Sequence, residues 1–207
     1  MSNSDTLLEQ ALQKALAQYA ETMGELFPTT PSLCNVDDPA FWASAEMNGS
    51  DFHIRVSTGV VEQVVGFWTS AFSDQEFLAS FGRAIKANAA DMAHISLVWL
   101  MLHELHHFQM GHFDHPKRSP TREGGGEEQF ALVRHAKMTE ERRSNSPKVS
   151  SCDAAACLEM QADHDATEML LDAYSSEEWL SLRARVTAVS AMMVLIERAD
   201  SAQHSPV

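Results

Sequence analysis

The stretch LVWLMLHELHHFQMGH, residues 97–112, decides the fold of this chain. An apolar run leads directly into a His-Glu-Leu-His-His segment, which predicts a helix that passes through the core. Residues four apart lie on one face of a helix, so the imidazoles of His103 and His107 can both reach one metal ion. Glu104 lies about 100° away around the axis, where it can reach a water on that ion. The segment therefore has the HExxH pattern, in which a metal activates a water molecule.

HExxH also occurs by chance in unrelated chains, so its surroundings have to support it. The simplest alternative is a helix whose polar face points to solvent. The apolar residues before His103 argue against it, because core helices rarely carry two histidines and a glutamate without partners for them. Gly111 stands where a left-handed residue commonly ends a helix, just after the second histidine. We therefore expect a metal site at this helix, and its third ligand has to come from elsewhere in the chain.

Charge and composition narrow the possible partners. The 207 residues suffice for a single well-cored domain, 1–207. The formal net charge of −14 argues against nucleic acid or an anionic membrane surface, because both attract basic patches. No signal peptide is evident, and the longest uncharged apolar segment, residues 186–196, is too short to span a bilayer. The three cysteines have no CxxC spacing and suggest free thiols, so we expect a cytoplasmic protein without a transmembrane segment.

The pattern of apolar residues predicts a mainly α (α+β) fold. Residues 1–27 should hold an N-terminal helix with an apolar stripe at helical spacing. Residues 52–112 should form a strand followed by the active-site helix, with a further helix over 60–72 between them. Strict alternation over 52–57 predicts a half-buried strand, and a short strand is expected around 43–47. The edge of the 52–57 strand is a candidate for pairing with an extended peptide.

The second half of the chain divides at a polar segment. Residues 113–149 are rich in proline, charge and glycine and are expected to be a flexible insertion, either a surface loop or a lid over the site. Within it a helix is expected over 127–142. Residues 150–200 should form C-terminal helices. The predicted core thus has two helices able to carry metal ligands, one on each side of the insertion.

The third metal ligand has several candidates. Glu159 is favoured, because it begins an E-x-x-A-D run on an otherwise apolar helix. Ala162 is small where that helix would press against the HExxH helix, and Asp163 can accept a hydrogen bond from a ligand histidine. Alone, a glutamate and an aspartate four apart would indicate a solvated helix face, and only HExxH reverses that preference. His112 is one place too early for the metzincin pattern and is expected to be structural. The full set of candidates is Glu159, His112, His115, His135 and His164.

HExxHxxxGH followed by ExxAD resembles the gluzincin metallopeptidases. The nearest group contains the heat-shock membrane protease HtpX and the CAAX prenyl endopeptidase, and the Lit-type phage-exclusion peptidases are also similar. The resemblance covers residues 52–173, including a strand, Thr58-Gly59 and a helix ahead of the active-site helix. Two features depart from the family. The chain lacks the transmembrane helices of the membrane members, and His106 replaces the small residue that usually precedes the second ligand.

The resemblance implies a zincin-like core with a small β-sheet, the HExxH helix and a second ligand-bearing helix. It implies one Zn²⁺ per chain on His103, His107 and Glu159, with Glu104 as the general base. Asp163 would then accept a hydrogen bond from a ligand histidine. The implied activity is hydrolysis of peptide bonds in a protein or peptide substrate. Candidates for the donor that stabilises the oxyanion are His135, His164 and Tyr174.

Two other interpretations have to be weighed. Glu104 and His107 also form a Glu-x-x-His pair, as in di-iron carboxylate bundles, which need a second such pair on another helix. The only similar pair, Asp91 and His94, lies on the same helix, which argues against two irons. The second alternative is a non-catalytic protein that uses the same fold to bind a partner. The presence of Glu104 argues against it, and the sequence carries no signal for the oligomeric state.

Overall fold

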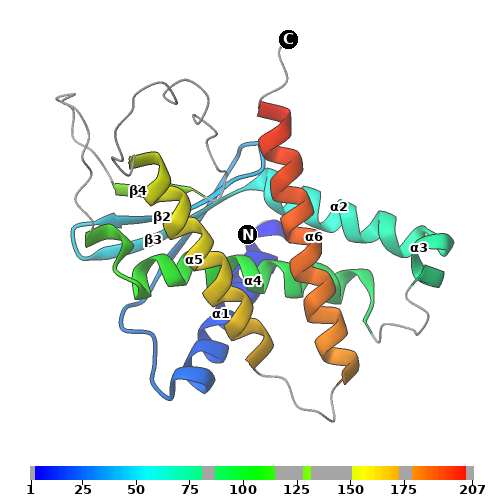
Figure 1. The fold of residues 1–207 in the computed structure, drawn as a ribbon, viewed down its shortest axis with the longest axis horizontal. Coiled ribbons are helices and arrows are strands. Elements are labelled where there is room, and N and C mark those ends of the chain that lie inside the picture. Colours follow the sequence, from blue (N-terminus) through cyan, green and yellow to red (C-terminus); the bar gives the residue numbers. More distant parts are fainter. Residues whose placement is uncertain (1–2, 81–86, 115–127, 132–150, 173–178, 204–207) are drawn as a thin grey trace, which may run out of the picture.

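The computed structural model describes residues 3–80, 87–114, 128–131, 151–172 and 179–203 (Figure 1). These residues form a mainly helical structure with a small β-sheet, so the predicted mainly α (α+β) class is confirmed. The predicted helices at the N-terminus, at 60–72 and at HExxH are all present. The elements in chain order are α1 Asn3–Met23, β1 Ser32–Val36, β2 Ala43–Asn48, β3 Asp51–Ser57, α2 Thr58–Ser73, α3 Gln75–Ser80, α4 Ala89–Gln109, the 3-10 turn η1 His112–Asp114, β4 Glu128–Ala131, α5 Ser151–Asp172 and α6 Trp179–Gln203.

The four-stranded sheet has the order β1-β3-β2-β4. β3 is parallel to β1 and antiparallel to β2, with Ile54 opposite Ala45. The predicted strand at 52–57 is confirmed, but it lies inside the sheet and both of its edges are paired. The suggestion that its edge could take up an extended peptide is therefore wrong. The strand β1, for which the sequence shows no clear alternation, lies at the edge of the sheet and pairs with β3.

Strand β4 corrects the helix expected over residues 127–142. Residues 128–131 pair antiparallel with β2, Phe130 lying opposite Ala45. β2 offers these residues a row of backbone hydrogen-bond partners, and such long-range pairing overrides a local preference for helix. The rest of the expected helix and of the expected insertion, apart from residues 113–114 in η1, lies outside the described residues.

Helix α4 is the centre of the fold, and Figure 1 shows it running across the middle of the molecule with α5 and α6 crossing it. It contacts α1, α2, α5, α6 and β2, and every residue from position 96 to position 107 is buried. A helix packed on all sides can carry apolar residues around its whole circumference. The polar residues of HExxH therefore sit inside the core rather than on a solvated face. No helix in the described ranges is long and apolar enough to cross a bilayer.

Both ends of α4 are fixed by residues close to them in the chain. At the start, Asn88 Oδ1 accepts a hydrogen bond from Asp91 N at 2.9 Å, and Asp91 Oδ2 accepts one from Asn88 N at 3.0 Å. This reciprocal capping box satisfies two backbone donors of the first turn. At the other end Gly111 has φ of 64°, a left-handed conformation that suits glycine and stops the helix. The chain therefore leaves α4 directly after the second histidine of HExxH.

The start of α2 is held beneath the connection between β1 and β2. Gly59 N and the Thr58 hydroxyl each donate to Asp38 O at 2.9 Å, and a side chain at Gly59 would collide with the carbonyl oxygens of Pro39 and Ala40. The Asp38 carboxylate accepts hydrogen bonds from Ala40 N at 2.9 Å and Trp42 Nε1 at 2.7 Å, which lower its pKa. This loop therefore ties the sheet to α2.

Candidate metal centre

Helices α4 and α5 run in opposite directions and meet at three levels spaced four residues apart. Trp99 Nε1 donates to Thr167 Oγ1 at 3.0 Å. One turn further along α4, His103 Nδ1 lies 3.0 Å from Asp163 Oδ1. At the third level, His107 Nε2 lies 3.7 Å from Glu159 Oε1. The two helix faces thus match turn by turn, and we call these pairs the three rungs: Trp99–Thr167, His103–Asp163 and His107–Glu159.

Three potential metal ligands converge between the last two rungs. His103 Nε2 lies 3.1 Å from His107 Nε2 and 3.4 Å from Glu159 Oε2. The other Glu159 oxygen, Oε1, lies 3.7 Å from His107 Nε2, so the carboxylate faces both histidines. We call the two Nε2 atoms and the facing Glu159 carboxylate the donor triangle. A tetrahedral zinc ion bound at about 2.0–2.1 Å holds its ligand atoms about 3.3 Å apart. Each of the three residues offers one atom to the donor triangle, all within 4.8 Å of one another, so the group could hold one metal ion.

The charge of the cluster also fits a cation. His103, Glu104 and His107 are 0% exposed and Glu159 is 7% exposed. Neither carboxylate oxygen of Glu104 has a hydrogen-bond partner among the residues that the structure describes. Buried carboxylates without partners cost several kcal/mol, so they are retained where they bind a cation or act on a ligand. The site combines the buried carboxylates of Glu104 and Glu159 with two histidines, and the half-buried Asp163 adds a third carboxylate beside His103.

The pKa values reflect this surplus of buried negative charge. Burial lowers the pKa of His103, but contacts with Asp163 and Glu159 outweigh it and raise the pKa to about 10. Burial raises the pKa of Glu104 to about 8, although the positive charge on His103 opposes the shift. The pKa of His107 is lowered, first by burial and then by the charge of its histidine neighbours. A proton on His103 thus provides the positive charge that a bound metal ion would also supply.

The structure brings together the residues that the sequence singled out. His103, His107 and Glu159 form a buried group able to hold a metal ion, and Asp163 contacts His103. Ala162 is 0% exposed, as expected for a small residue at the crossing of α5 with α4. His164 lies elsewhere: its side chain is 73% exposed and it contacts its own helix neighbours Asp165 and Glu168. The remaining candidates, His115, His135 and Tyr174, lie outside the described residues.

Sequence reasoning missed three supports of this site. His112, expected to be only structural, is 1% exposed, and its Nδ1 lies 2.9 Å from Nδ1 of His107. The Trp99 ring lies 5.6 Å from the His103 ring, and the Thr167 hydroxyl donates to Asp163 O at 2.7 Å. A tryptophan four residues before His103 and a threonine four residues after Asp163 were the available signals. Their significance depends on the crossing of the two helices, which the sequence does not reveal.

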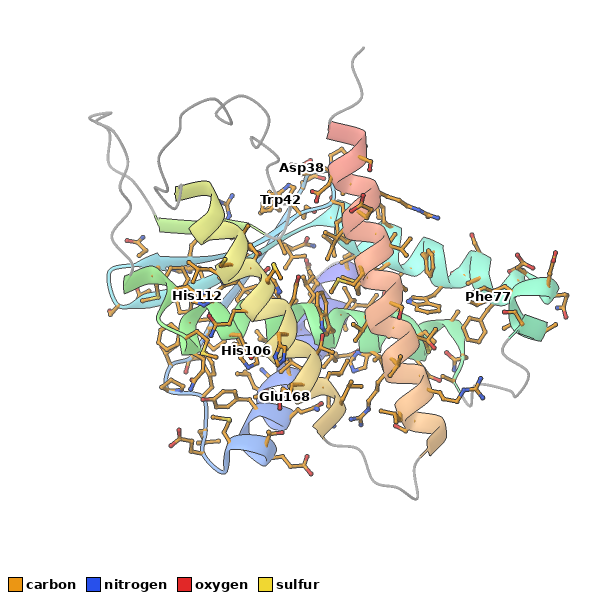
Figure 2. All side chains as sticks on the ribbon, viewed as in Figure 1. Asp38, Trp42, Phe77, His106, His112 and Glu168 are labelled. Atoms are coloured by element: carbon orange, nitrogen blue, oxygen red, sulfur yellow. The ribbon has the colours of Figure 1, made fainter. Side chains whose placement is uncertain are left out.

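His106, the departure from the family pattern, is accommodated by its own helix. Its Nδ1 donates to Leu102 O at 2.7 Å, and the ring is 5% exposed. In Figure 2 His112 lies beyond the C-terminal end of α4, and His106 lies further back along the helix. Because the His106 ring folds back on the preceding turn of α4, it takes up no space between His103 and His107. The bulky residue therefore leaves the donor triangle intact.

Comparisons with protein-family models, with curated proteins and with solved structures found no match. The family resemblance therefore rests on the motif residues themselves. The geometry that supports a metal centre is independent of it, since it depends only on positions in this chain.

Proposed function

We propose that this protein is a zinc-dependent endopeptidase. The observation that carries the proposal is the buried group of His103 Nε2, His107 Nε2 and the Glu159 carboxylate. Beside it lies the Glu104 carboxylate, which has no hydrogen-bond partner among the described residues. These three residues would hold the ion and leave a fourth position for water, which is the arrangement of catalytic rather than structural zinc sites. When bound, zinc would polarise the water and the substrate carbonyl.

Each protein residue then has a task that its surroundings allow. Glu104 accepts a proton from the attacking water and passes it to the leaving amine. Its carboxylate suits this task because no hydrogen bond from the described residues occupies either oxygen. Asp163 Oδ1 lies 3.0 Å from Nδ1 of His103, where it would attract the Nδ1 proton and so keep the lone pair of Nε2 directed toward the triangle. Glu159 supplies a negative ligand on the second helix.

A non-catalytic zinc protein is the second candidate, and the burial of the site favours it. With Glu104 and both histidines 0% exposed, a peptide has to displace covering groups before its carbonyl reaches the site. Against this candidate stands Glu104, which would be a costly residue in a site that only binds metal. We therefore prefer the endopeptidase. Two exposed free cysteines, Cys34 and Cys157, fit a reducing setting such as the cytoplasm.

Metal analysis and peptide cleavage test the proposal together. The purified chain should hold one zinc ion, whereas a di-iron protein would hold two irons. It should cleave unfolded protein substrates, and a chelator should abolish the cleavage. Glu159→Ala should lose both metal and cleavage, while His164→Ala, an exposed residue of the same helix, should lose neither. Stoichiometric zinc without cleavage in any form of the protein would favour the non-catalytic alternative.

Glu104→Gln separates binding from chemistry. The substitution is nearly isosteric and does not touch a ligand, so zinc should be retained. Hydrolysis should fall by about 10²-fold or more, because the positioned base is lost. Cleavage at the parental rate would contradict the proposed role of Glu104.

A further inference from the structure

We infer that His112 is a positioning residue that fixes the tautomer and ring orientation of the metal ligand His107. The inference rests on the proposed zinc site and adds a residue to it. The two Nδ1 atoms lie 2.9 Å apart, and the two rings meet at 67° with their centroids 5.0 Å apart. Both side chains are buried, His107 being 0% and His112 1% exposed. The contact is therefore shielded from water, which would otherwise compete for the same hydrogen bond.

The direction of this hydrogen bond follows from the donor triangle. Two neutral imidazole nitrogens at this distance share one proton, which belongs to one ring and is accepted by the other. Nε2 of His107 faces His103 and Glu159, so a metal there needs the Nε2 lone pair. A neutral His107 then carries its proton on Nδ1. His107 therefore donates to Nδ1 of His112, and His112 holds its own proton on Nε2.

The backbone explains how His112 reaches a residue five positions earlier. In a continuous helix, residues five apart lie about 140° apart around the axis and do not meet. Gly111 has φ of 64° and breaks the helix, after which η1 turns the chain back. Phe113, in η1, packs on Phe52 of β3 with ring centroids 6.2 Å apart and anchors the returning chain to the sheet. The glycine and the aromatic contact together hold the His112 ring against His107.

The site thus supports its two histidine ligands differently. His103 has a carboxylate partner, Asp163, whereas His107 has a neutral imidazole partner. Ligand histidines are commonly oriented by a carboxylate, a carbonyl or water on the other ring nitrogen. A carboxylate at His112 would add a further negative charge to a buried cluster that already holds Glu104, Glu159 and Asp163. An imidazole orients the ligand without that charge.

Zinc affinity of full-length variants, measured by competition with a chromogenic chelator, tests the inference. His112→Leu keeps a similar volume but cannot accept a hydrogen bond, and it should weaken zinc binding by about 10–100-fold. His112→Gln retains an acceptor and should recover most of that loss. The matched control is His106→Leu, which removes a neighbouring buried imidazole whose hydrogen-bond partner among the described residues is a carbonyl of its own helix. It should leave zinc affinity within about threefold of the parent, because such bonds do not orient a ligand.

The unaltered protein gives a second measurement that does not depend on the folding of a variant. In ¹⁵N NMR of the zinc-loaded chain, His107 should carry its proton on Nδ1 and His112 on Nε2. Parental zinc affinity in His112→Leu, or a proton found on Nδ1 of His112, would overturn the inference while leaving the zinc site standing. A parent chain that binds no zinc would overturn both this inference and the proposed function.

Discussion

Glu104→Gln should stabilise the metal-free protein, and the gain should grow with pH. Glu104 is 0% exposed, and its pKa is raised from an ordinary value of 4.5 to about 8. Between these two values the unfolded chain ionises this carboxyl while the folded chain keeps it protonated. The folded state therefore binds more protons, and its stability falls as pH rises through this window. Glutamine does not ionise, so the variant escapes this loss.

The expected magnitude follows from the same two pKa values. Each pH unit inside the window costs the parent about 1.4 kcal/mol, so the loss at pH 7 is about 3 kcal/mol relative to pH 4.5. His103 titrates in parent and variant alike, so its contribution largely cancels from their difference. The free energy of unfolding of the variant minus that of the parent should therefore rise by about 3 kcal/mol between pH 4.5 and pH 7.

Urea denaturation of chelator-treated protein at several pH values measures this difference. Glu197→Gln, an exposed glutamate on α6, is the matched control and should change stability by less than about 0.5 kcal/mol at every pH. A Glu104→Gln difference that stays constant over this range would refute the reasoning. It would mean that Glu104 ionises normally in the folded protein and that some group there stabilises its charge.

Two further substitutions test the packing around the site, and a third tests the loop that ties the sheet to α2. Ala162→Leu should overfill the crossing of α4 and α5, costing about 1–3 kcal/mol in urea unfolding and weakening zinc binding. Trp99→Phe should keep a ring on His103 but lose the hydrogen bond to Thr167, with a loss of about 1 kcal/mol on denaturation. Hydrogen bonds from the Ala40 backbone and from Trp42 lower the pKa of Asp38 from its ordinary value of 3.8. They therefore stabilise the fold above pH 3.8, and this stabilisation is lost as the pH falls below 3.8 and Asp38 becomes protonated. Asp38→Asn should therefore flatten the acid dependence of unfolding below pH 4, and an unchanged dependence would contradict this.

Local signals in the sequence were sufficient for α4 and its ligands. The capping box at Asn88, the left-handed Gly111 and the four-residue spacing of His103 and His107 each depend on residues close together in the chain. The spacing of Glu159 and Asp163 indicated a metal site only because HExxH requires a third ligand. That requirement comes from the chemistry of the metal and not from the geometry of the helix. These parts of the site were predictable because a helix imposes the same geometry wherever it lies.

The parts that were missed all depend on contacts between distant segments. Strand β4 exists because β2 offers it hydrogen-bond partners, and β3 is internal because β1 lies beside it. Neither fact changes the apolar pattern of the strand itself. The contact of His112 with His107 is near in sequence, but it depends on a break in the helix followed by a return. A pattern that assumes continuous helix places the two rings on different faces.

Because the three rungs join the same two helices, all three pairs change together when α5 slides along α4. A slip of α5 by one turn, about 6 Å, would set Asp163 opposite His107 and Thr167 opposite His103. Asp163, one methylene shorter, would then replace Glu159 beside His107, His103 would lose its carboxylate partner, and Trp99 would no longer face Thr167. A zinc ion held by His103, His107 and Glu159 would fit only the observed register, so its binding energy would add directly to the preference for that register. A bound metal ion would thus fix the position of α5 along α4. The population of the observed register should therefore increase with metal occupancy.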